Sequence, residues 1–342
     1  MQTERSFIIW DGDPVLFTIP EFQLPLPISV WGLVAGFALL FWLWKRFIPE
    51  IEEERQKIPF WKPWGIILGS LAAGQILFLF TGGPTIDTIG PIEPRWYGLM
   101  FATAFIFGYL LASRLMTVAG RTPEEVDRLL IYILIATVIG ARLGHVVFYD
   151  LSFYLRNPEL IPAIWRGGLA SHGAAIAIII AMWLYVKRTP RMTFYWLADR
   201  VVPSVAIGGM FIRIGNFFNS EILGTATDVP WAVIFARIDS VPRHPSMLYE
   251  SLSTLVVLAA IMAIYYRYDK KPPEGSMFGS FLVLLFTGRF LIEFTKLHHS
   301  DFEAALILNM GQWLSIPLVI FGAWLLLKKV DWGKKPLPET SS

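Results

Sequence analysis

The residues best suited to chemistry lie in one short segment, residues 213–224, which reads RIGNFFNSEILG. Arg213, Asn216, Asn219 and Glu221 directly follow an apolar run. An arginine held in lipid costs about 3 kcal/mol or more, so a chain that keeps one there usually gives it a partner or a task. Its planar guanidinium binds phosphate through paired hydrogen bonds and keeps its proton. A phosphate-bearing lipid headgroup is therefore the anionic ligand that this segment suits best.

The composition indicates that lipid surrounds much of the chain. Hydrophobic residues make up 55% of the 342 residues and charged residues only 16%, whereas soluble proteins keep roughly 25% charged residues. Mean hydropathy is +0.54. The net charge of +2 gives no concentrated basic face, so nucleic acid is not an expected partner. The absence of Cys excludes disulfides, thiolate metal sites and a cysteine nucleophile. We therefore expect an integral membrane protein.

Apolar runs long enough to cross the hydrocarbon, about 20 residues each, recur along the chain. They predict an all-α, polytopic integral membrane helical bundle of about nine transmembrane helices. No cleavable signal peptide is evident, so the first span is expected to remain as an anchor. Because the sixth span contains Asp199, Arg200 and Pro203, we expect it either to be broken or to pack against other helices. The predicted spans are residues 28–44, 64–80, 97–116, 129–148, 169–187, 195–212, 247–266, 276–296 and 307–327.

The distribution of lysine and arginine predicts the orientation of these spans. Both residues accumulate in the connections after the odd-numbered spans, and such residues concentrate on the cytoplasmic side of short loops. The N-terminus is therefore expected outside and the C-terminus in the cytoplasm. On this topology, polar residues of several helices gather with segment 213–224 near the extracytoplasmic leaflet. These residues are Tyr97, Arg142, His145, His172, Glu250, Arg289 and Glu293.

Structural roles remain open for several of the polar residues. Ion pairs, ring packing, turns and interfacial aromatic positions all use the same residue types. Three arginines at one depth with few acids are harder to explain in this way, which favours a bound anionic headgroup. The residues with a structural alternative are Tyr97, His145, Arg213 with Glu221, His244, Arg289 with Glu293, His298 and His299.

Segment 213–224 is similar to the signature Arg-x-Gly-Asn-x-x-Asn-x-Glu-x-x-Gly of the prolipoprotein diacylglyceryl transferases, a family of bacterial membrane enzymes. The resemblance covers about residues 85–330. It implies a seven-span transferase body at 81–330, which follows an N-terminal extension with two spans at 1–80 and precedes a cytoplasmic tail at 331–342. The other similar blocks are Arg95–Met100, Gly140–Gly144, Gly168–Gly173, His244–Glu250, Gly288–Glu293 and Met310–Pro317.

The resemblance also implies the reaction and the partners. The diacylglyceryl group of phosphatidylglycerol would move to the lipobox cysteine thiol of a prolipoprotein signal peptide, which forms a thioether and releases glycerol 1-phosphate. Because the thiol arrives with the substrate, the enzyme needs no Cys of its own. The expected location is the bacterial cytoplasmic (inner) membrane, among membrane lipids. No metal or other cofactor is implied, since the acids and histidines show no metal-ligand spacing.

The catalytic residues implied by the resemblance are His172, Arg213 and Arg289. A thiol of pKa about 8.5 is mostly protonated at neutral pH, so His172 would act as its base, or alternatively donate a hydrogen bond to the headgroup. The two arginines would hold the phosphodiester and stabilise the charge on the leaving group. The implied substrate-binding residues are Tyr97, Arg142, Arg213, Asn216, Asn219, Glu221, Gly224, Glu250 and Glu293.

A phospholipid-binding or lipid-moving membrane protein without catalysis is the alternative of a different class. A transporter would be expected to show broken helices in corresponding halves and a site near the bilayer midplane. The polar residues of this chain gather at one leaflet instead. A family member that has lost activity is a further alternative.

Overall fold

The computed structural model describes residues 7–29, 39, 85–89, 93–164, 167–297 and 308–333. Several expectations lie outside these residues. They are nearly all of the predicted span 28–44, the whole of 64–80, His298, His299 and most of the predicted tail.

The chain divides into two compact units, residues 15–95 and residues 1–14 with 96–342. The first residues belong to the larger unit because strand β1 (Ile8–Trp10) pairs in parallel with β4 (Val233–Phe235). The backbone N–H of Trp96 donates to the carbonyl of Pro14 at 2.9 Å, so the chain leaves and re-enters this unit at one place. The predicted division into an extension at 1–80, a transferase body at 81–330 and a tail at 331–342 stays a prediction.

The smaller unit contains one described pair of strands. Strand β2 (Phe22–Ser29) pairs antiparallel with β3 (Thr85–Ile89), and the register shifts between Gln23 and Ile28.

The larger unit is helical, which confirms a polytopic helical membrane protein. Among the described helices, six are long and apolar enough to cross a membrane, and a further apolar helix, α6, has 17 residues. Seven of the predicted spans coincide with these helices, while the total of nine depends on residues outside the described part. The helices are α3 (Trp96–Val118), α4 (Pro123–Phe148), α5 (Leu151–Arg156), α6 (Ser171–Lys187), α7 (Phe194–Asn219), α8 (Ser246–Arg267), α9 (Ser276–Ile292) and α10 (Met310–Lys328).

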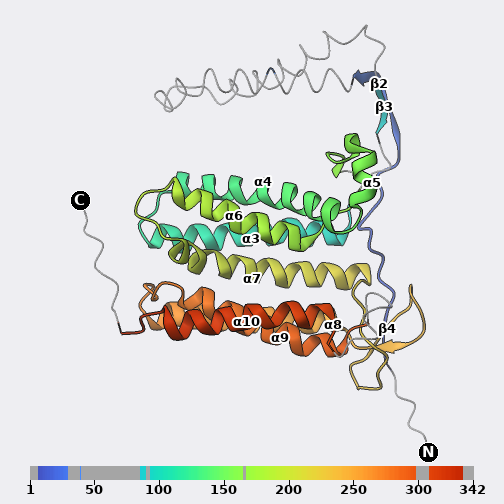
Figure 1. Ribbon diagram of the computed structural model, residues 1–342. Helices are drawn as coiled ribbons and strands as arrows, with labels where there is room; N and C mark the ends of the chain where they lie inside the picture. Colours follow the sequence, from blue (N-terminus) through green and yellow to red (C-terminus); the bar gives the residue numbers. More distant parts are fainter. Residues whose placement is uncertain are drawn as a thin grey trace, which may run out of the picture. The chain divides into compact units, whose positions relative to one another are not determined.

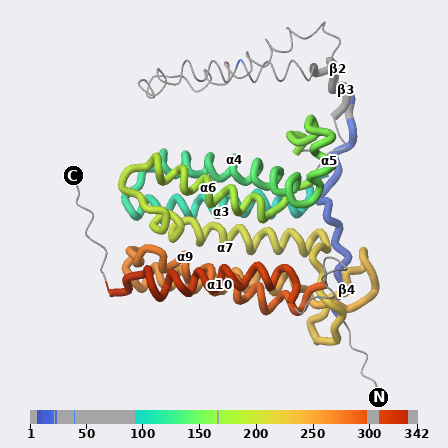
Figure 2. The backbone as a smooth tube through the Cα atoms, in the orientation of Figure 1, coloured from blue at the N-terminus to red at the C-terminus, as the bar shows by residue number. Residues whose placement is uncertain are grey.

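Helix α7, the predicted sixth span, is the central helix of the larger unit. Figure 1 shows it between α3, α4 and α6 on one side and α8, α9 and α10 on the other, and the tube in Figure 2 shows the same arrangement. Its buried side chains join two hydrophobic clusters: Leu197 packs with residues of α4 and α6, and Ala206 packs with residues of α8 and α9. The helix continues through Pro203. Of the two alternatives for this span, the structure therefore shows packing against other helices and not a break.

Helices α4 and α6 approach closely because glycines face each other. A Cβ atom on Gly173 would lie 2.3 Å from the carbonyl oxygen of Gly140 and 2.6 Å from Cα of Gly144. Small residues at such contacts let helix backbones approach within a membrane. This contact holds the first turn of α6, which contains His172, against the second half of α4.

Asp199 links α7 to the beginning of α9. Its fully buried carboxylate accepts hydrogen bonds from the backbone N–H groups of Gly275 at 2.7 Å and Phe278 at 2.8 Å. The first N–H groups of a helix lack partners within the helix, so an acceptor from another helix completes them. Asp199 therefore caps α9, whose other end contains Arg289 and Glu293.

We expect Asp199→Ala to destabilise the protein by about 3 kcal/mol, because two buried N–H groups lose their acceptor. Asp199→Asn should cost less, since its amide oxygen still accepts one bond. Thermal unfolding in detergent measures the difference. Asp127→Asn, which changes an exposed carboxylate on α4, serves as the control. An unchanged unfolding temperature in Asp199→Ala would contradict the capping role.

Candidate active site

The signature segment lies on the last turns of α7 and on the turn that ends it. The predicted span stopped at residue 212, but α7 continues to Asn219. Arg213, Asn216 and Asn219 therefore follow one another at three-residue spacing along the helix, where side chains are neighbours. Ser220 ends the helix with a left-handed φ of 56°. This turn brings Glu221 back to the helix end, where its N–H donates to the carbonyl of Asn216 at 2.9 Å.

Amide groups connect the polar side chains of this segment. A guanidinium nitrogen of Arg213 donates to Oδ1 of Asn216 at 3.1 Å. The Nδ2 atoms of Asn216 and Asn219 donate to the two carboxylate oxygens of Glu221, at 2.8 Å and 2.9 Å. These bonds fix the oxygen of Asn216 toward Arg213. The buried Oδ1 of Asn219 has no hydrogen-bond partner among the described residues.

The buried carboxylate of Glu250, on α8, is the point where three cations meet. Nε of Arg213 lies 2.8 Å from Oε2, and Nζ of Lys296 lies 2.8 Å from Oε1. A guanidinium nitrogen of Arg289, on α9, is 3.6 Å from Oε1. The cations come from α7, from α9 and from the turn after α9. Glu250 therefore joins the end of α7, the beginning of α8 and the end of α9.

The three cations differ in how far they are exposed. The side chain of Lys296 is only 3% exposed, and its ammonium group also donates to Glu293 at 2.9 Å. Glu293 in turn lies against Gly311 of α10, where a Cβ would be 2.7 Å from Cδ of the carboxylate. The side chains of Arg213 and Arg289 are 22% and 37% exposed. The arginines are therefore the cations that an incoming anion can reach.

Sequence reasoning did not single out Lys296. It appeared only as one basic residue on the outer side, and the available signal was its three-residue spacing from Glu293 on a helical pattern. Lys296 neutralises part of the negative charge of the Glu250 carboxylate, which would otherwise be shared by Arg213 and Arg289 alone.

A close crossing of three segments holds the beginning of α8 near the end of α9. The N–H of Gly224 donates to the carbonyl of His244 at 3.1 Å, and the N–H of Thr225 donates to the carbonyl of Thr295 at 2.8 Å. Ser246 also donates to Thr295. A Cβ atom on Gly224 would lie 2.3 Å from the oxygen of His244, so this crossing requires glycine. Glu250 and Lys296 are thereby kept close together.

The loop after Gly224 has its own polar contacts. Nδ1 of His244 lies 3.1 Å from the hydroxyl of Tyr249, which also accepts a hydrogen bond from Trp231. Arg243 donates to Asp239, and this hydrogen bond lowers the pKa of the Asp239 carboxyl. These contacts stabilise the loop beside the charged cluster.

Aromatic rings support the signature segment from the side of α3. Gly215 packs against Tyr97, because a Cβ on the glycine would be 3.0 Å from Cδ2 of the ring. Trp96 stacks on Phe218 with ring centroids 4.8 Å apart. Trp10 of β1 lies 4.5 Å from Phe217 by the same measure. Tyr97 is thus beside the turn of α7 that contains Arg213.

The remaining predicted residues lie in the pair formed by α4 and α6. His172 is exposed, and its ring centroid lies 5.1 Å from Phe148 and 5.7 Å from Tyr149. His145 stacks on Tyr149 and lies 3.7 Å from Asp150. Arg142 is 4% exposed and donates to backbone carbonyls. Contacts within the described residues therefore make two groups, the Glu250 cluster and the α4–α6 group.

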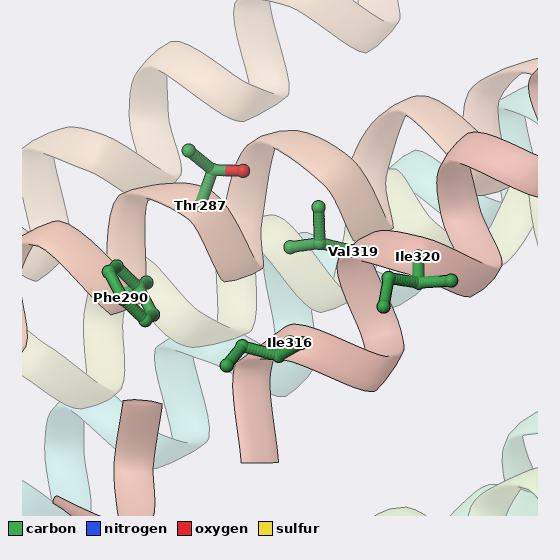
Figure 3. A pocket seen from close by; sticks show the side chains of 5 residues that line it. All are labelled: Thr287, Phe290, Ile316, Val319 and Ile320. Atoms are coloured by element: carbon green, nitrogen blue, oxygen red, sulfur yellow. The ribbon is translucent and has the colours of Figure 1, made fainter. Parts of the chain in front are cut away.

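An apolar hollow lies between α9 and α10, apart from the charged groups. Figure 3 shows Thr287 and Phe290 of α9 facing Ile316, Val319 and Ile320 of α10. Arg289 is near in sequence, but each residue turns a helix by about 100°, and its guanidinium reaches α8 instead. The hollow is not part of the charged cluster.

Comparison with known proteins identifies related sequences. The model of the prolipoprotein diacylglyceryl transferase family matches residues 84–328. Three relatives are named phosphatidylglycerol–prolipoprotein diacylglyceryl transferase. The protein from Tolumonas auensis is 45% identical over 251 residues, which cover 73% of this chain and 97% of the relative. Those from Chloroherpeton thalassium and Bacteroides fragilis are 41% and 38% identical and cover 72% and 74% of this chain, and 92% and 94% of their own lengths.

The close approach of Gly224 to the carbonyl of His244 can be tested by adding a methyl group. Gly224→Ala should lower stability by about 1–3 kcal/mol, because the new methyl group overlaps the carbonyl of His244. Gly208→Ala on α7 is the matched control, since a Cβ there meets nothing within 4 Å. Thermal unfolding of both variants in detergent makes the comparison. Equal unfolding temperatures would show that the crossing tolerates a side chain.

Proposed function

The chain belongs to the prolipoprotein diacylglyceryl transferase family, and from this premise we propose how its residues carry out the transfer. It is a multi-pass membrane transferase, and its reaction moves the diacylglyceryl group of phosphatidylglycerol to a prolipoprotein. The acceptor in our proposal is the thiol of the lipobox cysteine in the signal peptide. The absence of Cys from the enzyme fits a nucleophile that comes with the substrate.

The proposed step exchanges one bond at the glyceryl carbon that bears the phosphate. The cysteine sulfur forms a bond to this carbon, and the bond from the carbon to the phosphate oxygen breaks. The electron pair of the broken bond leaves with glycerol 1-phosphate, and the thiol proton passes to a base. The product is a thioether. The enzyme must therefore stabilise negative charge on the leaving phosphate and accept a proton from sulfur.

The convergence of Arg213 and Arg289 on Glu250 is the observation that carries this proposal. The carboxylate holds two partly exposed guanidinium groups at one place, which suits a phosphodiester. Arg213 is tightly held by Glu250 and Asn216, so it anchors the phosphate. Arg289, at 3.6 Å from Glu250, is held more loosely and stabilises the charge that develops on the leaving group. Glu293 and Lys296 keep Glu250 in place.

The other residues of the signature segment shape the headgroup site in this proposal. Asn216 and Glu221 orient Arg213. The unpartnered Oδ1 of Asn219 accepts a hydrogen bond from a glycerol hydroxyl. Tyr97 lines the site from α3, and Gly224 allows the backbone to cross close behind it.

His172 is the base in this proposal. It stands in the first turn of α6, and a helix N-terminus favours negative charge and therefore a thiolate nearby. Its ring is exposed beside Phe148 and Tyr149, so an apolar signal peptide can bring its thiol to the imidazole. The alternative is that His172 only donates a hydrogen bond to the headgroup.

We place the protein in the bacterial inner membrane with the site toward the extracytoplasmic leaflet. The basic residues that follow the odd-numbered predicted spans support this orientation, because they lie at the helix ends opposite the Glu250 cluster. The N-terminus is then outside and the C-terminus cytoplasmic. Within the described helices and their connections, these basic residues are Arg121, Arg128, Lys187, Arg188, Arg191, Arg267, Lys270, Lys271, Lys328 and Lys329.

A first prediction concerns Arg213. Arg213→Lys keeps the charge but loses the planar fork, so transfer should fall by about 10²-fold or more while the protein still accumulates in the membrane. The assay supplies phosphatidylglycerol and a lipobox peptide and detects the thioether by mass spectrometry. Arg128→Lys changes a basic residue near the beginning of α4, at the end of the helices away from the Glu250 cluster, and should behave like wild type. Full activity of Arg213→Ala would refute the site, and lipid binding by wild type without thioether formation would favour a lipid-binding protein.

A second prediction separates the two roles of His172. If it is the base, His172→Gln should lose about 10²–10⁴-fold in rate at neutral pH and keep lipid binding. Raising the pH toward the pKa of the peptide thiol, about 8.5, should recover part of the rate because more thiolate forms unaided. If it only binds the headgroup, lipid binding weakens and alkaline pH restores nothing. A pH–rate profile with lipid binding on the same samples decides between them.

A further inference from the structure

Arg142 is enclosed by the backbone that precedes α6. Its Nε donates to the carbonyl of Ile161 at 2.7 Å. One terminal nitrogen donates to Gly167 at 2.7 Å and to Gly168 at 3.2 Å. The other donates to Leu160 at 2.7 Å. All three nitrogens of the guanidinium are therefore engaged by carbonyl oxygens of the protein, and none of these bonds points to a phosphate site.

The surroundings of Arg142 are closed on the other sides as well. Its guanidinium carbon lies 4.9 Å from the ring centroid of Tyr154, a cation–π distance. A Cβ on Gly168 would be 2.9 Å from a guanidinium nitrogen and 2.6 Å from the ring of His145. Gly167 and Gly168 both have left-handed φ values, 82° and 70°, which turn their carbonyls toward the arginine. This backbone is shaped around the guanidinium.

The same backbone leads directly into the first turn of α6. The N–H of Ala170 donates to the carbonyl of Ala141, the residue before Arg142, at 2.9 Å. His172 follows two residues later, and Gly173 packs on α4. The position of His172 therefore depends on where Arg142 holds the carbonyls of Gly167 and Gly168.

We propose that Arg142 is a positioning residue, which holds the entrance of α6 and so places His172 for the transfer. This differs from the expectation that Arg142 lines the lipid pocket. A phosphate that engaged its guanidinium would have to displace the backbone carbonyls that all three of its nitrogens already bind. The proposal rests on the role of His172 in the proposed function.

Arg142→Lys in the full-length protein tests this role. Lysine keeps the charge but has a single nitrogen in place of the planar fork, so it cannot hold the same set of carbonyls. We expect kcat to fall by about 10- to 100-fold, because a base displaced by about 1 Å loses its geometry, while KM for phosphatidylglycerol stays near wild type. A rise in KM with unchanged kcat would instead show direct contact with the lipid and overturn the proposal. Arg156→Lys, an exposed arginine of α5, is the matched control.

A second measurement does not depend on activity. The rate at which diethyl pyrocarbonate acylates His172, followed by peptide mass spectrometry, should change in Arg142→Lys and remain unchanged in Arg156→Lys. An unchanged rate in Arg142→Lys would overturn the proposal. Wild-type protein that forms no thioether refutes the proposed function, whereas the acylation rates still report on the position of His172.

Gly167→Ala tests the role of the backbone before α6 without changing Arg142. A Cβ there meets nothing within 4 Å, so the substitution acts only through the left-handed φ of 82°. It should lower kcat, leave KM for phosphatidylglycerol unchanged, and alter the acylation rate of His172. This variant keeps the test decisive if Arg142→Lys fails to fold. Wild-type kcat and acylation in a folded Gly167→Ala would overturn the proposal.

Discussion

The buried carboxylate of Glu250 is the constraint on which the site depends. A charged group within a membrane protein must be paired, because its desolvation is costly. Glu250 has three cationic partners, from α7, from α9 and from the turn after α9. Neither α7 nor α9 can shift at this end without breaking an ion pair. The same arrangement leaves two arginines partly exposed at one point, so the pairing that stabilises the bundle also keeps two cations where an anion can reach them.

A second carboxylate fixes the other end of the same helices. Asp199 of α7 caps the beginning of α9, while Arg213 and Arg289, near the far ends of these helices, share Glu250. Helices α7 and α9 are thus connected at both ends, with an apolar interface between them. Hydrophobic contact cannot fix helix register within lipid, because lipid is equally apolar. The two carboxylates supply that register and determine the depth at which the arginines meet.

The sequence predicted the helices of the larger unit well, because apolar length and loop charge are local signals. It also predicted that Arg213, Glu250 and Arg289 lie near one another, and the ion pairs agree with this. It could not reveal that β1 pairs with β4, since these strands lie far apart in the chain. Lys296 was missed because a lysine near a loop is usually exposed. The carbonyl partners of Arg142 depend on backbone conformation, which residue types do not specify.

In the proposed mechanism, charge binding and proton transfer use separate groups. The carboxylates Glu221, Glu250 and Glu293 are engaged by amides and cations, whereas the described ring contacts of His172 are aromatic. The histidine lies on the α4–α6 pair and the arginines lie on α7 and α9, so the two kinds of group belong to different helices. In the proposed mechanism, the lipid phosphate and the peptide thiol therefore approach groups of different character, and the substrates themselves bridge the two parts of the site.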